Sequence, residues 1–128
     1  MLSSDPPAGS GVVLVVEDDF DVLNAIANIL EDAGYQVLRT ANSAEALDQL
    51  EARKRCDLIL LDLLMPVMHG WDFRRKQMQT PGIADIPVVL MSAGAHMAAV
   101  SGDLQAAGYL TKPVDMNDLL GVARRYSS

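Results

Sequence analysis

The sequence lacks the features of secreted, membrane-spanning and nucleic-acid-binding proteins. A single cysteine, Cys56, excludes an internal disulfide framework and favours a cytoplasmic setting. Charged or turn residues interrupt every apolar run before it reaches the roughly 20 residues of a membrane helix. Lysine and arginine total 10 against 17 aspartate and glutamate residues, so the net charge of -7 works against binding a polyanion. We therefore expect a protein that neither spans a membrane nor binds nucleic acid.

The remaining composition is that of one globular domain. The chain has 128 residues, of which 50% are hydrophobic and 21% charged, so it can bury one core but is too short for two. Residues 1–11 are polar and rich in Ser, Pro and Gly, without the basic start or apolar run of a signal peptide. We expect a flexible leader over residues 1–11 and a single domain over residues 12–126.

Five short apolar segments alternate with segments of helical periodicity. The expected strands cover residues 12–16, 35–40, 58–61, 87–91 and 109–111. The expected helices cover residues 21–33, a segment opened by Asn42, residues 71–79, a weak segment that contains Gly102, and a last segment capped by Asp115. This alternation predicts an α/β fold, in which a parallel sheet is covered on both faces and right-handed crossovers join the strands.

Polar residues follow four of the expected strands, where each strand ends. They are Glu17, Asp18 and Asp19 after the first strand, Asp62 after the third, Ser92 after the fourth and Lys112 after the fifth. Because ligands of open parallel sheets bind beyond the carboxyl ends of the strands, we expect these side chains to converge. Clustered carboxylates repel one another and bind hard cations, so the acids predict a Mg²⁺ site.

The same edge of the sheet carries the groups needed for phosphoryl transfer. A carboxylate beside a metal ion can attack a phosphoryl group, while the metal, a lysine and a hydroxyl stabilise charge on the transferring oxygens. Asp62 is the best-placed nucleophile, with Lys112 and Ser92 as the stabilising cation and hydroxyl.

Four segments resemble the receiver domains of response regulators along residues 12–126. They are residues 15–19, residues 60–66 together with Gly70, residues 91–93 and residues 108–113. The resemblance implies a flavodoxin-like (βα)5 doubly wound fold with strand order 2-1-3-4-5. It also implies a phosphorylation switch of a two-component or phosphorelay system, not a turnover enzyme. The expected phosphoryl donor is a sensor histidine kinase or a histidine phosphotransfer protein.

The resemblance assigns the metal-binding and phospho-accepting residues. Asp62 matches the phospho-acceptor, which is also a metal ligand. Glu17 and Asp18 match the acidic pair, and Asp18 is expected to bind Mg²⁺ directly and Glu17 through a water. The backbone carbonyl of Leu64 matches a further metal ligand.

The resemblance also assigns the residues of a switch. Ser92 matches the hydroxyl that turns toward the phosphoryl group, and Lys112 matches the lysine that pairs with that group. Tyr109 matches the switch aromatic, and Pro113 matches a proline that follows a cis bond. The surface expected to signal is formed by the fourth helix, the fifth strand and the fifth helix, about residues 95–126.

Several residues depart from the family pattern. Ser92 stands where threonine is commoner, so the switch loses the stiffness of a β-branched side chain. The segment from Ser92 to Lys112 is shorter than expected and contains Gly102, which predicts a short or distorted fourth helix. Two positions expected to flank the phosphoryl group are also unusual: Leu64 is apolar, and Gly94 has no side chain.

Three alternative functions share parts of this pattern. A haloacid-dehalogenase-like phosphatase would need a second acid two residues after the nucleophile, where this chain has Leu64. A flavodoxin-like redox carrier would need a phosphate-binding loop after the first strand, where the three acids would repel FMN phosphate. A pseudo-receiver that serves only as an interaction module would not need the complete set of site residues.

Overall fold

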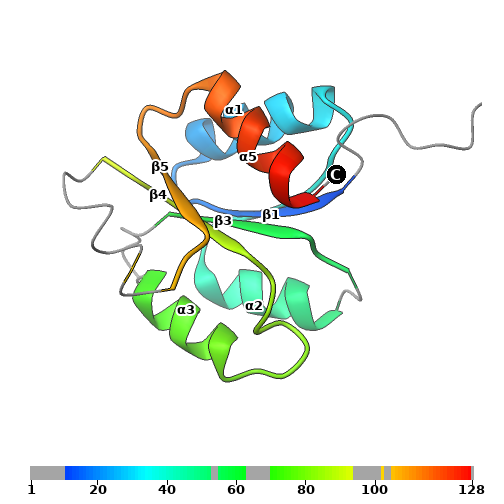
Figure 1. The fold of residues 1–128 in the computed structure, drawn as a ribbon, viewed down its shortest axis with the longest axis vertical. Helices are drawn as coiled ribbons and strands as arrows, with labels where there is room; N and C mark the ends of the chain where they lie inside the picture. Colours follow the sequence, from blue (N-terminus) through cyan, green and yellow to red (C-terminus); the bar gives the residue numbers. More distant parts are fainter. Residues whose placement is uncertain (1–10, 53–54, 63–69, 94–101, 103–104, 128) are drawn as a thin grey trace, which may run out of the picture.

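The computed structural model describes residues 11–52, 55–62, 70–93, 102 and 105–127 (Figure 1). The strands are β1 (Val12–Val16), β2 (Gln36–Thr40), β3 (Leu58–Asp62), β4 (Val88–Ser92) and β5 (Gly108–Thr111). The helices are α1 (Phe20–Asp32), α2 (Ser43–Ala52), α3 (Gly70–Met78) and α5 (Met116–Ser127). Residues 1–10 of the expected leader and most of the weak fourth helix lie outside the described residues.

All five strands form one parallel sheet in the order β2-β1-β3-β4-β5, which confirms the predicted topology. Helices α1 and α5 cover one face of the sheet, and α2 and α3 cover the other (Figure 1). The backbone ladder begins at Gly11, whose carbonyl accepts a hydrogen bond from the Gln36 amide at 3.0 Å. Because every connection crosses from one strand end to the start of another, the carboxyl ends of all five strands share one edge.

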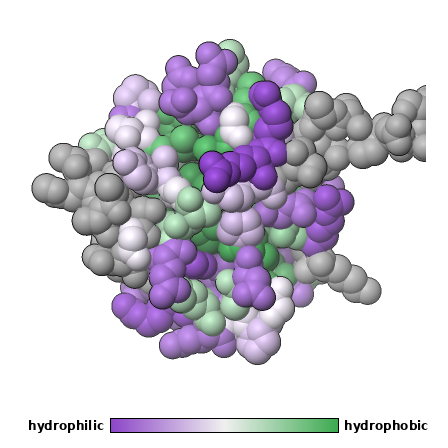
Figure 2. All heavy atoms as spheres, in the orientation of Figure 1, coloured by the Kyte–Doolittle hydropathy of each residue, from purple (hydrophilic) through white to green (hydrophobic). Residues whose placement is uncertain are grey.

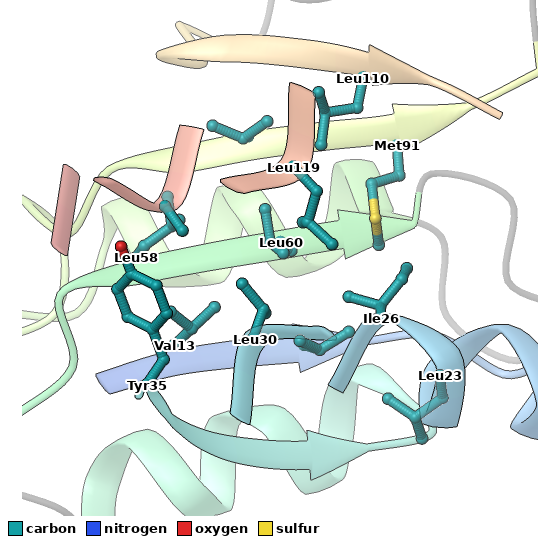
Figure 3. Close-up of a cluster of buried hydrophobic side chains, with 13 residues drawn as sticks. Val13, Leu23, Ile26, Leu30, Tyr35, Leu58, Leu60, Met91, Leu110 and Leu119 are labelled. Carbon is teal, nitrogen blue, oxygen red and sulfur yellow. The ribbon is translucent and has the colours of Figure 1, made fainter. Parts of the chain in front are cut away.

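The core has two layers, one on each side of the sheet. Strands β1, β3 and β4 are buried along their whole length, as their unbroken aliphatic sequences predict. Since successive strand residues point to opposite faces, each of these strands supplies both layers. The layer under α1 and α5 is shown in Figure 3, where Leu60 of β3 lies among Leu30, Ile26 and Leu119 of the helices.

Side-chain caps set the starts of three helices. Asp19 accepts hydrogen bonds from two amides in the first turn of α1, which therefore begins at Phe20, one residue before the expected start. Asn42 caps α2 as predicted, since its side chain accepts from the Glu45 amide; the Glu45 carboxylate accepts in return from the amide of Ala41, one residue before the cap. Asp115 caps α5 in the same way, as expected.

The outer faces of the helices are mainly polar. In the orientation of Figure 1, hydrophilic side chains cover much of the visible surface, and hydrophobic side chains show between them (Figure 2). Among the helices that the structure describes, none is both long enough and apolar enough to cross a membrane.

Candidate functional site

Three carboxylates meet at the carboxyl edge of the sheet. Each of Glu17, Asp18 and Asp62 offers one oxygen, and these oxygens lie within 4.8 Å of one another. Glu17 follows β1 and Asp62 ends the neighbouring strand β3, so the parallel register places them side by side. Glu17 and Asp62 are buried, at 1% and 3% exposure, whereas Asp18 is the most exposed of the three. An all-oxygen cluster with one accessible member fits the ligand preference of Mg²⁺.

Lys112 supplies the positive charge of this cluster. Its Nζ donates to Glu17 Oε1 at 2.5 Å and lies 3.5 Å from Asp62 Oδ1. Burial by itself lowers the pKa of Lys112, but its hydrogen bond to Glu17 and the negative charges of Asp62 and Glu17 outweigh this effect and leave the pKa raised. The ammonium is therefore protonated at neutral pH and offsets part of the negative charge of two buried carboxylates.

Protein donors occupy both oxygens of the Glu17 carboxylate. Lys112 binds Oε1, and the Asp19 amide donates to Oε2 at 3.2 Å. The Glu17 amide in turn donates to the Thr40 carbonyl at 3.0 Å, which extends the pairing of β1 with β2. Glu17 is thus fixed in place before any metal binds. This arrangement suits the expected contact through a water, which stays a prediction.

Sequence reasoning missed the bond between Lys112 and Glu17. It predicted Lys112 only as a partner of a phosphoryl group, but in the described structure the ammonium pairs with carboxylates. A single lysine at the end of a strand, opposite three acids in a chain of net charge -7, is the signal that could have indicated the pairing.

The expected switch residues Ser92 and Tyr109 lie on neighbouring strands. Ser92 ends β4 and is 5% exposed, and β4 lies between the strands that carry Asp62 and Lys112. The Lys112 amide donates to the Ser92 carbonyl at 2.9 Å, which fixes the end of β5 against β4. Tyr109 lies on β5 and is 43% exposed. The roles of these residues stay predictions.

Two further expectations concern the loops at this edge. The bond between Lys112 and Pro113 is cis, as predicted. Leu64, whose carbonyl is an expected metal ligand, lies outside the described residues, as does Gly94. The described part of the site therefore comprises Glu17, Asp18, Asp62, Ser92 and Lys112, which come from four strand ends.

The chain matches a known family over most of its length. The family model of the response regulator receiver domain matches residues 13–124. This range contains every residue assigned to the site.

Curated relatives share about a third of their aligned residues with the chain. The probable transcriptional regulator ycf29 of Pyropia yezoensis is 34% identical over 112 residues, which are 86% of this chain and 50% of that protein. The DNA-binding dual master transcriptional regulator RpaA of Synechocystis is 32% identical over 88% of this chain and 47% of that protein. An uncharacterized 14.6 kDa protein of Leptolyngbya boryana is 33% identical over 89% of this chain and 88% of that protein.

The chain spans about half the length of the first two of these relatives. One of the two is DNA-binding by name, so the comparisons give no support to the expectation that nucleic acid is excluded as a partner.

Solved structures of the same type superpose over nearly the whole chain. The chemotaxis protein CheY4 of Vibrio cholerae has a TM-score of 0.83 and 28% identity, covering 91% of this chain and 98% of that one. A putative response regulator from Chloroflexus aurantiacus has a TM-score of 0.82 and 28% identity, covering 90% of this chain and 95% of that one.

Proposed function

Because this chain belongs to the response regulator receiver domain family, we propose that it accepts a phosphoryl group on Asp62 from a phosphohistidine protein. The donor is a sensor histidine kinase or a histidine phosphotransfer protein. The observation that carries the proposal is the group of three carboxylates with one shared ammonium, in which Lys112 Nζ lies 3.5 Å from Asp62 Oδ1.

In the proposed reaction, a carboxylate oxygen of Asp62 forms a bond to phosphorus. The bond between phosphorus and the donor's histidine nitrogen breaks, and the electron pair of that bond stays on the imidazole. Lys112 neutralises negative charge on the transferring oxygens, and the Ser92 hydroxyl donates a hydrogen bond to one of them. These side chains are held by strand ends, so their positions need little rearrangement during the transfer.

Mg²⁺ is the proposed cofactor. Asp18 and Asp62 would hold it directly, together with the carbonyl of Leu64, and Glu17 would hold it through a water. When bound, the ion supplies positive charge to the phosphoryl oxygens. Asp18 suits the direct role, since it is the most exposed member of the carboxylate cluster.

The proposed output is a change of surface. A phosphoryl group adds negative charge and acceptor oxygens beside Ser92 and Lys112, so the Ser92 hydroxyl turns toward it and Tyr109 turns inward. The altered surface is the one formed by residues 95–126, which a partner protein reads. We propose a cytoplasmic setting, because the lone Cys56 provides no disulfide framework of the kind that secreted domains use.

Mass spectrometry of the intact protein tests the acceptor. Incubation with acetyl phosphate or a phosphohistidine donor and Mg²⁺ should add one phosphoryl group, which hydroxylamine should remove because an acyl phosphate is labile to it. Asp62→Asn should abolish the addition, and Asp48→Asn, on the exposed face of α2, should leave it intact. Equal labelling of the Asp62→Asn protein would exclude Asp62 as the acceptor.

Labelling and a separate turnover assay distinguish the alternatives. A pseudo-receiver would show no labelling of the native protein. A phosphatase of the haloacid dehalogenase type would hydrolyse many equivalents of an added phosphomonoester, whereas the proposed receiver would not.

A further inference from the structure

The buried face of α3 carries a polar network where the packing of a helix on a sheet calls for apolar residues. Gln77 is completely buried and Arg74 is 7% exposed. A buried amide or guanidinium destabilises a fold unless hydrogen bonds satisfy it. Arg74 Nη1 donates to Gln77 Oε1 at 2.7 Å, and Gln77 Nε2 donates to the carbonyls of Ile83 and Ile86 at 2.8 and 3.0 Å. The network is therefore satisfied and specific.

The network also includes a residue of the segment that leads into β5. Arg74 Nη2 donates to the Gln105 carbonyl at 2.9 Å, a contact between residues 31 positions apart. Gln105 has a φ of 54°, a left-handed conformation that a residue other than glycine adopts only when its surroundings hold it. Figure 1 shows α3 beside the start of β5. The guanidinium thus fixes an unusual turn just before the strand.

Strand β5 is held at both ends. It lies at the edge of the sheet and pairs with β4 on one side. At its start, the Ala107 amide donates to the Val88 carbonyl at 2.8 Å, two residues after the carbonyl that Arg74 holds. At its far end, Lys112 binds Glu17 and Ser92. Tyr109 lies between these two attachments.

We propose that Arg74 and Gln77 are positioning residues that hold the start of β5 fixed, so that a change at the Lys112 end moves Tyr109 instead of shifting the whole strand. The inference rests on the proposed function, because the change at Lys112 is the arrival of a phosphoryl group. An edge strand without a fixed start could take up the same change by sliding or fraying, since only one neighbouring strand pairs with it. The network removes that possibility.

Amide NMR with and without beryllofluoride and Mg²⁺ tests the proposal, because beryllofluoride stands in for the phosphoryl group. In the native protein, the amides of Tyr109 and Lys112 should shift, whereas those of Gln105 and Ala107 should stay in place. In Arg74→Met/Gln77→Leu, which replaces the network by apolar side chains, the shift at Tyr109 should fall about twofold or more. Amide exchange at Ala107 should become about tenfold faster.

The matched control is Arg75→Met, on the same helix. Arg75 is exposed and pairs with Asp72 at 3.1 Å, so its loss should leave the response of Tyr109 at the native size. A folded double variant with a native-sized response would overturn the proposal, and so would a native protein in which Gln105 shifts as much as Tyr109. These results would leave phosphorylation of Asp62 untouched.

A second pair of variants keeps the proposal testable if the double variant does not fold. Arg74→Lys keeps the charge but loses the planar guanidinium, which donates in two fixed directions. The beryllofluoride-induced shift of the Tyr109 amide should therefore be smaller in Arg74→Lys than in Arg75→Lys. Equal responses of this pair would overturn the proposal. A native protein that shows no response to beryllofluoride anywhere would instead overturn the proposed function itself, and the inference with it.

Discussion

At the scale of single residues, environment decides what a side chain can do. Lys112 and Cys56 are both partly withdrawn from solvent, but their surroundings act in opposite ways. Lys112 meets carboxylates that stabilise its charged form. Burial raises the pKa of the Cys56 thiol to about 11, and its Sγ donates to the Leu58 carbonyl at 3.4 Å. The thiol therefore stays neutral, as expected of a small buried residue.

We expect the Cys56 thiol to react slowly in the folded protein. Its pKa is about 11 against an ordinary value of 9.0, and each pKa unit is tenfold, so the thiolate fraction near neutral pH is about a hundredfold lower. Because burial disfavours the thiolate only in the folded state, the stability of the fold should fall as the pH rises from about 9 to about 11. The rate of thiol labelling at about pH 8, with and without denaturant, checks this expectation. Equal rates in both states would contradict it.

At the scale of elements, periodicity and caps set the boundaries, and burial of one face supplies the stability. Helix α5 shows both effects, because Asp115 caps its start and Leu119 packs on the sheet with 0% exposure (Figure 3). Met116, one turn earlier, is 54% exposed. Because both residues are large and apolar, a difference between them in stability reports the effect of burial and not of residue type.

Leu119→Ala should destabilise the fold much more than Met116→Ala. Truncation of a fully buried leucine removes apolar contacts and leaves a cavity, which costs about 2–5 kcal/mol in free energy of unfolding. The change at exposed Met116 should stay within about 0.5 kcal/mol. Urea unfolding of the two variants measures both values. Losses of similar size would mean that α5 does not pack on the sheet through Leu119.

At the scale of the whole molecule, the sheet topology concentrates negative charge at one edge. Glu17, Asp18 and Asp62 repel one another, and Lys112 compensates only part of their charge. A cation that binds this edge in the folded state alone stabilises the whole domain by mass action. Asp19, next to the cluster, has a different task, because its side chain caps α1.

Thermal melts with Mg²⁺ should therefore distinguish two adjacent aspartates. The metal should stabilise the native protein by about 1.4 kcal/mol at roughly ten times its dissociation constant. Asp18→Ala should abolish most of this gain. Asp19→Ala should keep the gain but lower the stability of the metal-free protein by about 1 kcal/mol, through the lost cap. An equal loss of the metal effect in both variants would count against the assignment of Asp18.

The order of the strands within the sheet was expected from the family resemblance, whereas the sequence by itself determined the order of the elements along the chain and the edge where the site residues gather. These properties follow from local patterns: aliphatic runs for buried strands, capping residues for helix starts, and acids placed where strands end. Most element boundaries differ from the expected ones by a residue; α1, for example, begins at Phe20 because Asp19 caps it.

Only the tertiary structure decided which polar side chains meet. The pairing of Lys112 with Glu17 joins residues 95 positions apart, and the bond from Arg74 to Gln105 spans 31. The local sequence of α3 gives no indication that Arg74 and Gln77 are buried, since both side chains are polar. Periodicity describes one element at a time. Burial and charge pairing depend on the distances between residues of different elements, which are set only when the helices pack on the sheet.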